Sequence, residues 1–596
     1  MKKLLFISIG LLLVCQTIPA AAKTAPAVRI PLSFDFYYTY DMMVEAMQAL
    51  HKAYPQLTHL DLVGKSEEGR PVYCLTVNNP KTGPELEKPG IWVDGNIHGN
   101  EIQAGEVALY LLQFLLGEYG QNSEITRLVD SRCFYVVPVV NADGRYHFLA
   151  DASTPSDNRS LRIPRDDDHD GLVDEDFADD LDKDGSICVM RKRDEFGEFK
   201  TDPEDPRLMI RIKPGEKGEW TILGDEGIDN DNDGRINEDA EGYLDGNRNW
   251  GFDWMPEYVQ SGAGNYPFSG AITKALAGFI SQRPNICIGW TFHNSGGMFL
   301  RGPSSKAQGE YPKPDIQVYD YLGQQAERMT PGYRYMISWK DLYTTYGDSL
   351  EWLTMLQGAY GFCGELFMTE HEGFQTLKES QNEIKNPISS DSQDEEGGYD
   401  FSQAPGLEKQ RLKFNDNLAQ GELYKPWKAF QHPVYGAIEI GGWVKMSSRL
   451  PAPFMLKDLV HRNASAIIFS AKNTPELSLE ILETKGLGNG VTRVRTRLAN
   501  AKAIPSMSYQ AQKSNLYPKD MLIASGAGLK ILAGGEITDI YTDKVAYKEF
   551  RPEIQFLFVP GFGKVEHEFL VAGTGSLTIS YQSRHAGKIT KTVTLQ

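Results

Sequence analysis

The sequence predicts an α/β domain, whose sheet is covered by helices on both faces, followed by a β-sandwich. Residues 90–97 and 132–140 are short and nearly continuously apolar, which is typical of strands buried on both faces. Residues 102–117 between them have the composition of a buried helix, and strand, helix and strand together predict an α/β unit. From about residue 475 the chain changes to short alternating segments separated by turn residues, which predicts an all-β sandwich.

The remaining elements of the first domain follow from the same patterns. Residues 41–53 place apolar side chains at helical spacing, which predicts a helix near the start of the domain. Residues 285–292 and 360–367 are again short apolar runs and are expected to be further buried strands.

Two segments lack this apolar texture. Residues from about 150 to 245 are rich in Asp, Gly and Asn, and residues 378–405 are polar and acidic. We expect the first to be an elaborated loop excursion and the second an exposed loop. The predicted domains are therefore 23–455, with the acidic insertion at about 150–245, and 475–596.

Length, charge and cysteine content limit the classes of protein. The 596 residues are enough for roughly two to four domains. The net charge of −19 offers no basic surface for nucleic acid. Beyond the N-terminal segment the chain has five widely spaced cysteines and no CxxC pair, which excludes both a disulfide framework and a structural zinc site of cysteines.

The N-terminus has the features of an export signal. Lys2 and Lys3 precede an apolar run at 4–14, and small residues end at Ala22, so we predict a signal peptide at residues 1–22 and a secreted or periplasmic protein. An uncleaved anchor is the alternative, although the run is short for a membrane span. No later stretch is long and apolar enough to cross a bilayer.

A histidine and a glutamate follow the predicted strand 90–97. His98 and Glu101 lie three residues apart, and His293 ends the apolar run at 285–292. A catalytic zinc site needs three such nitrogen or oxygen ligands and one open position. Each feature alone is more often structural, but together they predict a zinc site.

The motifs in order resemble those of the zinc carboxypeptidases of the A, B and T type. The resemblance covers roughly residues 35–375 and rests on an ordered set of segments: HGNE at 98–101, NADG at 141–144, MRK at 190–192, GNRNW at 246–250, FHNS at 292–295, and YTTYGDSLEW leading to FCGEL at 343–366. It implies a mixed sheet, zinc held by His98, Glu101 and His293, and peptide hydrolysis.

The resemblance also implies the catalytic base and the carboxylate clamp. Glu365 matches the glutamate that takes a proton from zinc-bound water and passes it to the leaving amine, where a structural ion pair is the alternative. Arg248 beside Asn247 matches the pair that grips the terminal carboxylate of the substrate, for which a guanidinium is well suited. A surface ion pair is the alternative role for Arg248.

Three further roles are implied by position in these motifs. Arg191 matches the arginine that stabilises the oxyanion, with Arg193 as a near neighbour. Tyr343 matches the tyrosine that caps the substrate, with Tyr346 as a rival. Leu350 would line the pocket for the C-terminal side chain and favour apolar residues there. The sequence departs from the family pattern in the long distance from Glu101 to His293, and in FHNS, which lacks a Tyr after the histidine.

Three acidic segments share the spacing D-x-D-x-D-G. This spacing places carboxylates at alternate positions before a glycine turn, as in calcium loops, with a solvated acidic loop as the alternative. The carboxylates concerned are Asp166, Asp168 and Asp170; Asp180, Asp182 and Asp184; and Asp229, Asp231 and Asp233. We expect any calcium there to be structural.

The sequence thus predicts an exported zinc metallocarboxypeptidase that acts on a peptide substrate. One alternative is a peptidoglycan-peptide or D-amino-acid amidase with the same zinc chemistry. Another is a non-catalytic binding protein on a peptidase scaffold, against which the presence of all three ligands and Glu365 argues. The sequence does not give the oligomeric state.

Overall fold

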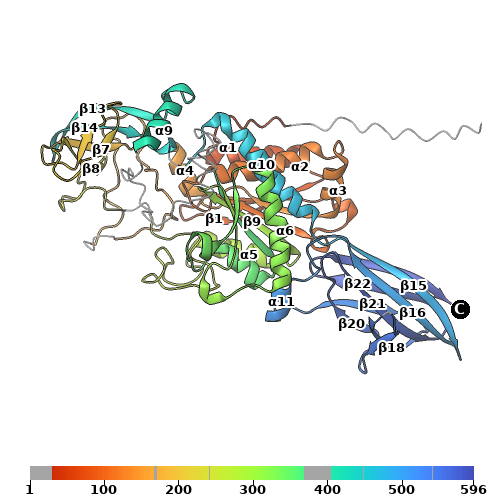
Figure 1. Ribbon diagram of the computed structural model, residues 1–596. Helices are drawn as coiled ribbons and strands as arrows, with labels where there is room; N and C mark the ends of the chain where they lie inside the picture. The colour runs from red at the N-terminus through yellow and green to blue at the C-terminus, as the bar shows by residue number, and fades with distance from the viewer. Residues whose placement is uncertain (1–29, 167–170, 240–241, 368–404, 448, 540) are drawn as a thin grey trace, which may run out of the picture.

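The structure is a computed structural model of the chain. It describes residues 30–166, 171–239, 242–367, 405–447, 449–539 and 541–596. The predicted signal peptide and nearly all of the predicted loop at 378–405 lie outside these residues. Figure 1 shows a central α/β body between a small second sheet on one side and the C-terminal β domain on the other. Within the described part of the chain, no helix combines the length and the apolar character of a membrane span.

The central body contains an eight-stranded mixed sheet in the order β1-β2-β4-β3-β9-β12-β10-β11. The strand bounds are β1 Thr58–Lys65, β2 Pro71–Val77, β3 Gly90–Gly95, β4 Cys133–Val137, β9 Ile286–Asn294, β10 Met298–Arg301, β11 Arg334–Ile337 and β12 Tyr360–Leu366. The four predicted strands are confirmed as β3, β4, β9 and β12.

Helices pack on both faces of this sheet, as predicted. A side chain at Gly95 would meet Ala104 of α2 at 2.7 Å, whereas Trp92, which points to the other face, packs on Phe279 of α5. The helices of the body are α1 Tyr40–Ala53, α2 Gln103–Glu118, α3 Ser123–Ser131, α4 Ala142–Ala150, α5 Ala271–Ser281, α6 Lys313–Met329, α7 Ser349–Trp352 and α10 Pro453–Lys472. The predicted helices at 41–53 and 102–117 correspond to α1 and α2.

The central strands bring their carboxyl ends to one edge of the sheet. Strands β3, β9 and β12 are neighbours and run parallel, and every residue of β3 and β9 is buried. The residues that follow β3 and those at the ends of β9 and β12 must therefore meet at this edge. The predicted zinc ligands and Glu365 all belong to these three chain segments.

The body extends beyond the predicted end at residue 455. Helix α10 contributes Leu456, Val460 and Ile467 to the same hydrophobic core as the sheet, and it packs on α2 and α6. Its apolar face covers the helices of the body rather than the C-terminal domain, so the first domain continues to Lys472.

The predicted loop excursion contains a second sheet. Its order is β13-β14-β5-β8-β6-β7, with bounds β5 Val189–Arg193, β6 Phe199–Thr201, β7 Met209–Arg211, β8 Trp220–Asp225, β13 Tyr424–His432 and β14 Gly436–Trp443, and helix α9 Pro405–Asn417 beside it. Cys188 and Met190 of one segment share a small core with Ile438 and Ile440 of the other. Because the two halves of this core lie far apart in sequence, neither half shows a long apolar run.

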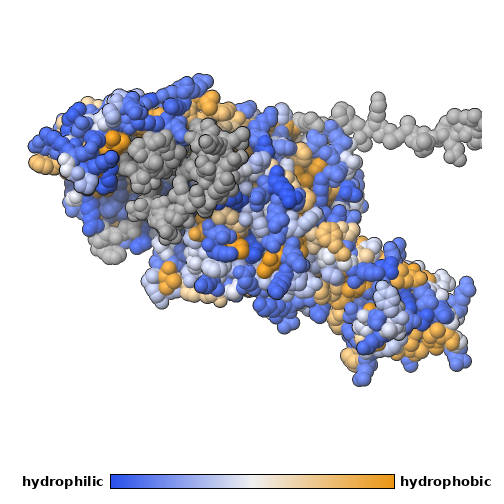
Figure 2. Space-filling view, in the orientation of Figure 1, coloured by the Kyte–Doolittle hydropathy of each residue, from blue (hydrophilic) through white to orange (hydrophobic). Residues whose placement is uncertain are grey.

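The C-terminal domain is the predicted all-β sandwich. Two antiparallel sheets have the orders β15-β16-β21-β18-β19 and β20-β17-β22-β23. Their bounds are β15 Leu477–Gly488, β16 Val491–Asn500, β17 Asp520–Ser525, β18 Lys530–Asp539, β19 Lys544–Tyr547, β20 Ile554–Leu557, β21 Lys564–Ala572, β22 Gly575–Ser583 and β23 Gly587–Leu595, with the short helix α11 Tyr509–Ser514. Val494 and Phe569 of one sheet share a core with Leu522 and Leu577 of the other. Its visible surface mixes hydrophobic and hydrophilic areas (Figure 2).

Candidate metal centre

The turn between β3 and α2 positions the first two candidate ligands. The Asn96 side chain donates to the carbonyl oxygens of His98 (2.6 Å) and Gly99 (3.1 Å) and so holds the turn closed. Gly99 lies so close to the backbones of Gly144 and Asn158 that a Cβ there would be 2.7 Å from atoms of both. The HGNE segment therefore needs a glycine at this position, and the turn points His98 and Glu101 in the same direction.

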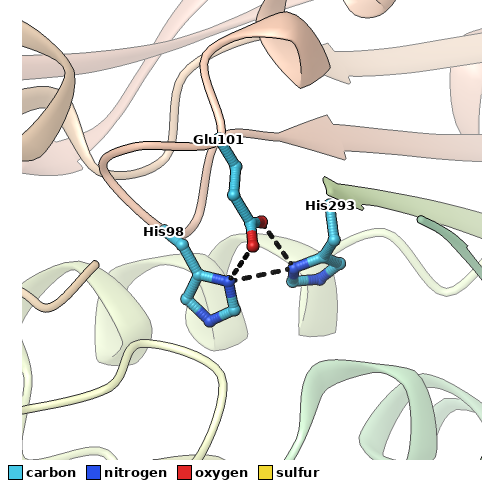
Figure 3. Close-up of side chains that lie close together, drawn as sticks. All are labelled: His98, Glu101 and His293. Carbon is cyan, nitrogen blue, oxygen red and sulfur yellow. Dashed lines mark hydrogen bonds and ion pairs between the residues drawn. The ribbon is translucent and has the colours of Figure 1, made fainter. Parts of the chain in front are cut away.

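His98, Glu101 and His293 bring three ligand atoms together (Figure 3). The Nδ1 atoms of the two histidines are 3.2 Å apart, and each is 3.0 Å from an oxygen of Glu101. Their side chains are only 1–2% exposed. Two ring nitrogens and a carboxylate that face one another in a buried space fit a zinc ion by the chemistry of the donors.

The opposite ring nitrogens are held by hydrogen-bond partners. His98 Nε2 is 3.0 Å from Asp245 Oδ1, and His293 Nε2 is 3.3 Å from Thr291 Oγ1. The Thr291 hydroxyl donates its own proton to Asp94, so it can accept from His293. The carboxylate of Asp245 sets His98 to carry the proton on Nε2 and to leave Nδ1 free for a metal, as metal-ligating histidines do, whereas His293 Nε2 also lies 3.4 Å from the Asn247 amide nitrogen.

Charges in the centre stabilise ionised carboxylates. Burial alone raises the pKa of Glu101, but His98 and His293 outweigh it and hold that pKa well below its ordinary range. Burial also opposes ionisation of Asp245, and Arg159, His98 and Arg248 reverse the effect, so the pKa of Asp245 lies well below its usual value. Asp245, which directly precedes the GNRNW segment, was missed from the sequence.

Glu365 lies beside the three ligands. It pairs in register with His293 across β12 and β9, so the two side chains emerge on the same face at the carboxyl edge of the sheet. Burial raises the pKa of Glu365 above its ordinary range, Glu101 adds to the rise, and His293 opposes it. A carboxyl group in this position is suited to accept and release a proton.

One cavity is lined both by the metal centre and by the residues predicted to bind the substrate. Asn247, Arg248, Tyr343, Leu350 and Glu365 all line it. Asn247 is fixed because its Oδ1 accepts from the backbone of Ser349 at 2.9 Å, which ties the loop of Arg248 to helix α7. The apolar part of the wall is formed by the side chains of Leu300, Leu342, Leu350 and Cys363.

Arg191 does not belong to this cavity, and its predicted role is wrong. It lies in β5 of the second sheet, where its Nη2 atom contacts Glu439 at 2.6 Å. Its guanidinium is stacked between Trp220 and Trp427, 3.9 and 3.8 Å from their ring centres. The MRK segment follows the acidic insertion, and the insertion carries it away from the metal centre.

Two other arginines line the cavity and were missed from the sequence. Arg159 Nη1 is 3.7 Å from Glu101 Oε1, and its Nε atom donates to Asp245 at 2.9 Å. Arg159 lies between the NADG segment and the first acidic motif, before the insertion. This position could have identified it as a residue of the cavity. Arg449 Nη2 is 3.9 Å from Glu101 Oε1 and donates to the carbonyl oxygen of Asn294 at 2.6 Å, and no sequence signal marks it.

The acidic motifs gather carboxylates as their spacing predicts. Ligand atoms of Asp180, Asp182 and Asp184 lie within 4.8 Å of one another and of Glu226, and those of Asp229, Asp231 and Asp233 also form a group. In the first motif only Asp166 lies in the described part of the chain, because Asp168 and Asp170 fall in the gap at 167–170. None of the carboxylates in the described part of these motifs lines the cavity of the metal centre.

Comparison with known proteins identifies related chains. The family model described as zinc carboxypeptidase matches residues 43–172 and 225–387, and a domain of unknown function matches residues 476–594. Human carboxypeptidase D is 36% identical over 117 residues, 20% of this chain and 8% of that protein. Mouse carboxypeptidase M is 32% identical over 113 residues, 19% of this chain and 26% of that protein. The chain thus matches only a small part of the length of these relatives.

Two solved structures align with about half of the chain. Thrombin activatable fibrinolysis inhibitor covers 56% of this chain and 67% of its own, with 18% identity and a TM-score of 0.39. Carboxypeptidase A from Helicoverpa armigera covers 58% of this chain and 68% of its own, with 19% identity and a TM-score of 0.38.

Proposed function

We propose, from the premise that this chain belongs to the zinc carboxypeptidase family, that it is a zinc-dependent metallopeptidase that releases residues from the C-terminus of peptides. The observation that carries the proposal is the meeting of His98, Glu101 and His293 in the wall of a cavity that also contains Glu365 and Arg248. A metal site, a proton acceptor and a carboxylate-binding group lie together there.

His98, Glu101 and His293, which line the cavity, would hold the metal. Zinc bound in this way acts as a Lewis acid and lowers the pKa of a bound water to about 7. Glu365 accepts the proton of the attacking water on its carboxylate and returns it to the leaving amine. Its raised pKa suits it to both halves of this transfer.

Two arginines of the cavity have separate roles in binding the substrate and in stabilising developing charge. Arg248, which is 4% exposed and steadied by Asn247, binds the terminal carboxylate of the substrate. Arg159, beside Glu101, donates to the oxygen of the scissile carbonyl as negative charge develops on it. This is the role that the sequence assigned to Arg191.

The apolar wall sets the side-chain preference. Leu300, Leu342 and Leu350 offer no charged partner for a basic side chain. Asp348 also lines the cavity, but its oxygens accept from Thr345 and the backbone of Glu351, so the enzyme prefers an apolar C-terminal residue. Tyr343 at the rim of the same cavity covers the bound residue. The preference extends the expectation that the sequence attached to Leu350.

Export and structural calcium complete the proposal. Residues 1–22 direct the chain out of the cytoplasm, as their charge and apolar pattern predicts. The motifs 180–185 and 229–234, which bring their carboxylates together, bind calcium and stiffen the insertion. Calcium that leaves the melting temperature unchanged would contradict the second statement.

The experiment compares wild type with Glu365→Gln. We expect about one zinc per chain in both proteins, and release of C-terminal residues from peptides by the wild type only. Muropeptides tested in parallel examine the amidase alternative. Zinc bound without hydrolysis of any of these substrates would favour a binding protein, and a wild type without zinc would refute the proposal.

A further inference from the structure

Two segments of the insertion are held together by hydrogen bonds. Asp239 Oδ2 accepts from the backbone nitrogens of Glu175 and Asp176 at 2.6 and 2.7 Å. The Asn230 amide donates to Asp176 at 3.1 Å and to Asp179 at 3.0 Å. Residues 174–179 and 229–239 therefore lie side by side, although the whole stretch 180–228 separates them in the sequence.

Three carboxylates meet between these segments. Ligand oxygens of Asp176, Asp231 and Glu238 lie within 4.8 Å of one another. Asp176 is 0% exposed, and both its Oδ2 atom and Glu238 Oε2 are buried without a hydrogen-bond partner. Burying a carboxylate oxygen without a partner is costly, so this arrangement calls for a cation.

No side-chain cation in the described part of the chain fills that role. Among the described residues, none of these three carboxylates forms a salt bridge with a lysine, arginine or histidine, since the nearby Arg235 pairs with Asp233. Burial raises the pKa of Asp176, and burial with the adjacent Asp176 raises that of Glu238 to about 7. Three acids in one place without a counter-charge would repel one another.

The neighbouring acidic group shows the contrast. Asp182 and Asp184 lie 3.1 and 3.7 Å from Lys428 and Lys425. Both oxygens of Glu226 accept backbone N–H groups. Lysines and backbone N–H groups therefore already stabilise part of that cluster. In the cluster around Asp176, by contrast, carboxylate oxygens face one another.

We propose that Asp176, Asp231 and Glu238 form a calcium site that fastens segment 174–179 to segment 229–239. The donors are all oxygens, as calcium requires, and its larger, flexible coordination shell is completed by water and further oxygens. The site shares Asp231 with the loop predicted at 229–234, but Asp176 and Glu238 lie outside any D-x-D-x-D-G motif. Segment 229–239 leads toward Asp245 and Arg248, so the ion steadies the approach to the metal centre.

Calcium titration of the full-length, zinc-loaded protein tests the site. Wild type, Asp176→Asn, Glu238→Gln and the control Asp179→Asn are stripped of metals on a chelating resin, reloaded with one equivalent of zinc and titrated by calorimetry with CaCl2. Asp179 shares the Asn230 contact of Asp176 but lies outside the carboxylate group. We expect Asp176→Asn and Glu238→Gln each to lose one calcium equivalent or to bind it at least ~10-fold more weakly, and Asp179→Asn to titrate as wild type.

Melting temperature provides a second readout. Calcium should raise it in the wild type and in Asp179→Asn, and by less in the two site variants. Site variants that titrate and melt like wild type would overturn the proposal, as would equal binding of MgCl2 at the same concentration. If Asp176→Asn fails to fold by circular dichroism, Glu238→Gln carries the test, because Glu238 is partly exposed and its carboxamide keeps the shape of the side chain.

Discussion

Asp245 connects a metal ligand to two other parts of the centre. It contacts His98 Nε2 at 3.0 Å and Arg159 at 2.9 Å, and its Oδ1 also accepts from the backbone of Asn247 at 2.7 Å. Asp245→Asn would remove the charge that orients the imidazole, so we expect zinc affinity to fall ~10- to 100-fold. Competition with a chromogenic chelator measures this, and an unchanged affinity would show that the contact is incidental.

Mutation can distinguish the roles of Arg159 and Arg191, because the sequence predicted for Arg191 the role that we propose for Arg159. Arg159→Ala removes the proposed donor to the reacting carbonyl, so we expect kcat to fall ~10²- to 10³-fold. Arg191→Ala removes a guanidinium bonded to Glu439 and stacked on two tryptophans, so it should cost about 2 kcal/mol of stability and leave kcat unchanged. The opposite pattern would restore Arg191 to the active site.

At the scale of elements, the second sheet depends on strands from distant parts of the sequence. Ile440 of β14 is 1% exposed and packs against Cys188 and Met190 beside β5. Ile440→Ala should cost about 2–5 kcal/mol and raise hydrogen exchange at residues 189–193, more than two hundred residues away. Hydrogen exchange followed by mass spectrometry measures this. Exchange that rises only near residue 440 would mean that the two segments are not one folding unit.

Whether a strand is buried by its own apolar residues or by a distant segment explains which elements could be predicted from the sequence. Strands β3 and β9 are buried throughout, so each is visible as a continuous apolar run, and the HGNE motif contains Gly99, where close packing requires a glycine. Strand β5 has only its first three residues buried, and these are the residues that pair with β14. Single-segment patterns cannot detect a core that two segments share, and for the same reason Arg191 was placed in the wrong part of the molecule.

At the scale of the whole molecule, the sandwich is fastened to the body by polar contacts. Asp315 at the start of α6 accepts from the backbones of Tyr509 (3.1 Å) and Gln510 (2.7 Å). Arg584 donates to the carbonyl oxygen of Pro284 at 2.7 Å. Two buried histidines, His567 and His585, lie in the sandwich, and His585 directly follows the arginine of this contact.

These histidines make the stability of the sandwich depend on pH. Burial, with nearby Lys548, lowers the pKa of His567 to about 4, and burial with Arg584 lowers that of His585 to about 3. An unfolded histidine titrates near 6.5, so the folded state prefers the neutral ring. The stabilisation is complete above pH ~6.5 and is lost as pH falls toward the folded pKa values, at about 2 kcal/mol for each histidine by pH 5.

Calorimetry at pH 7, 6 and 5 tests this with His585→Gln and a control, His59→Gln, whose side chain is 68% exposed. We expect the unfolding of the wild-type sandwich to shift to lower temperature as pH falls, and His585→Gln to show a smaller shift because it has lost one of the two titrating rings. The control should follow the wild type. If the unfolding temperature falls equally in all three proteins, protonation of His585 does not cause the acid sensitivity. Groups elsewhere in the protein would then be responsible for it.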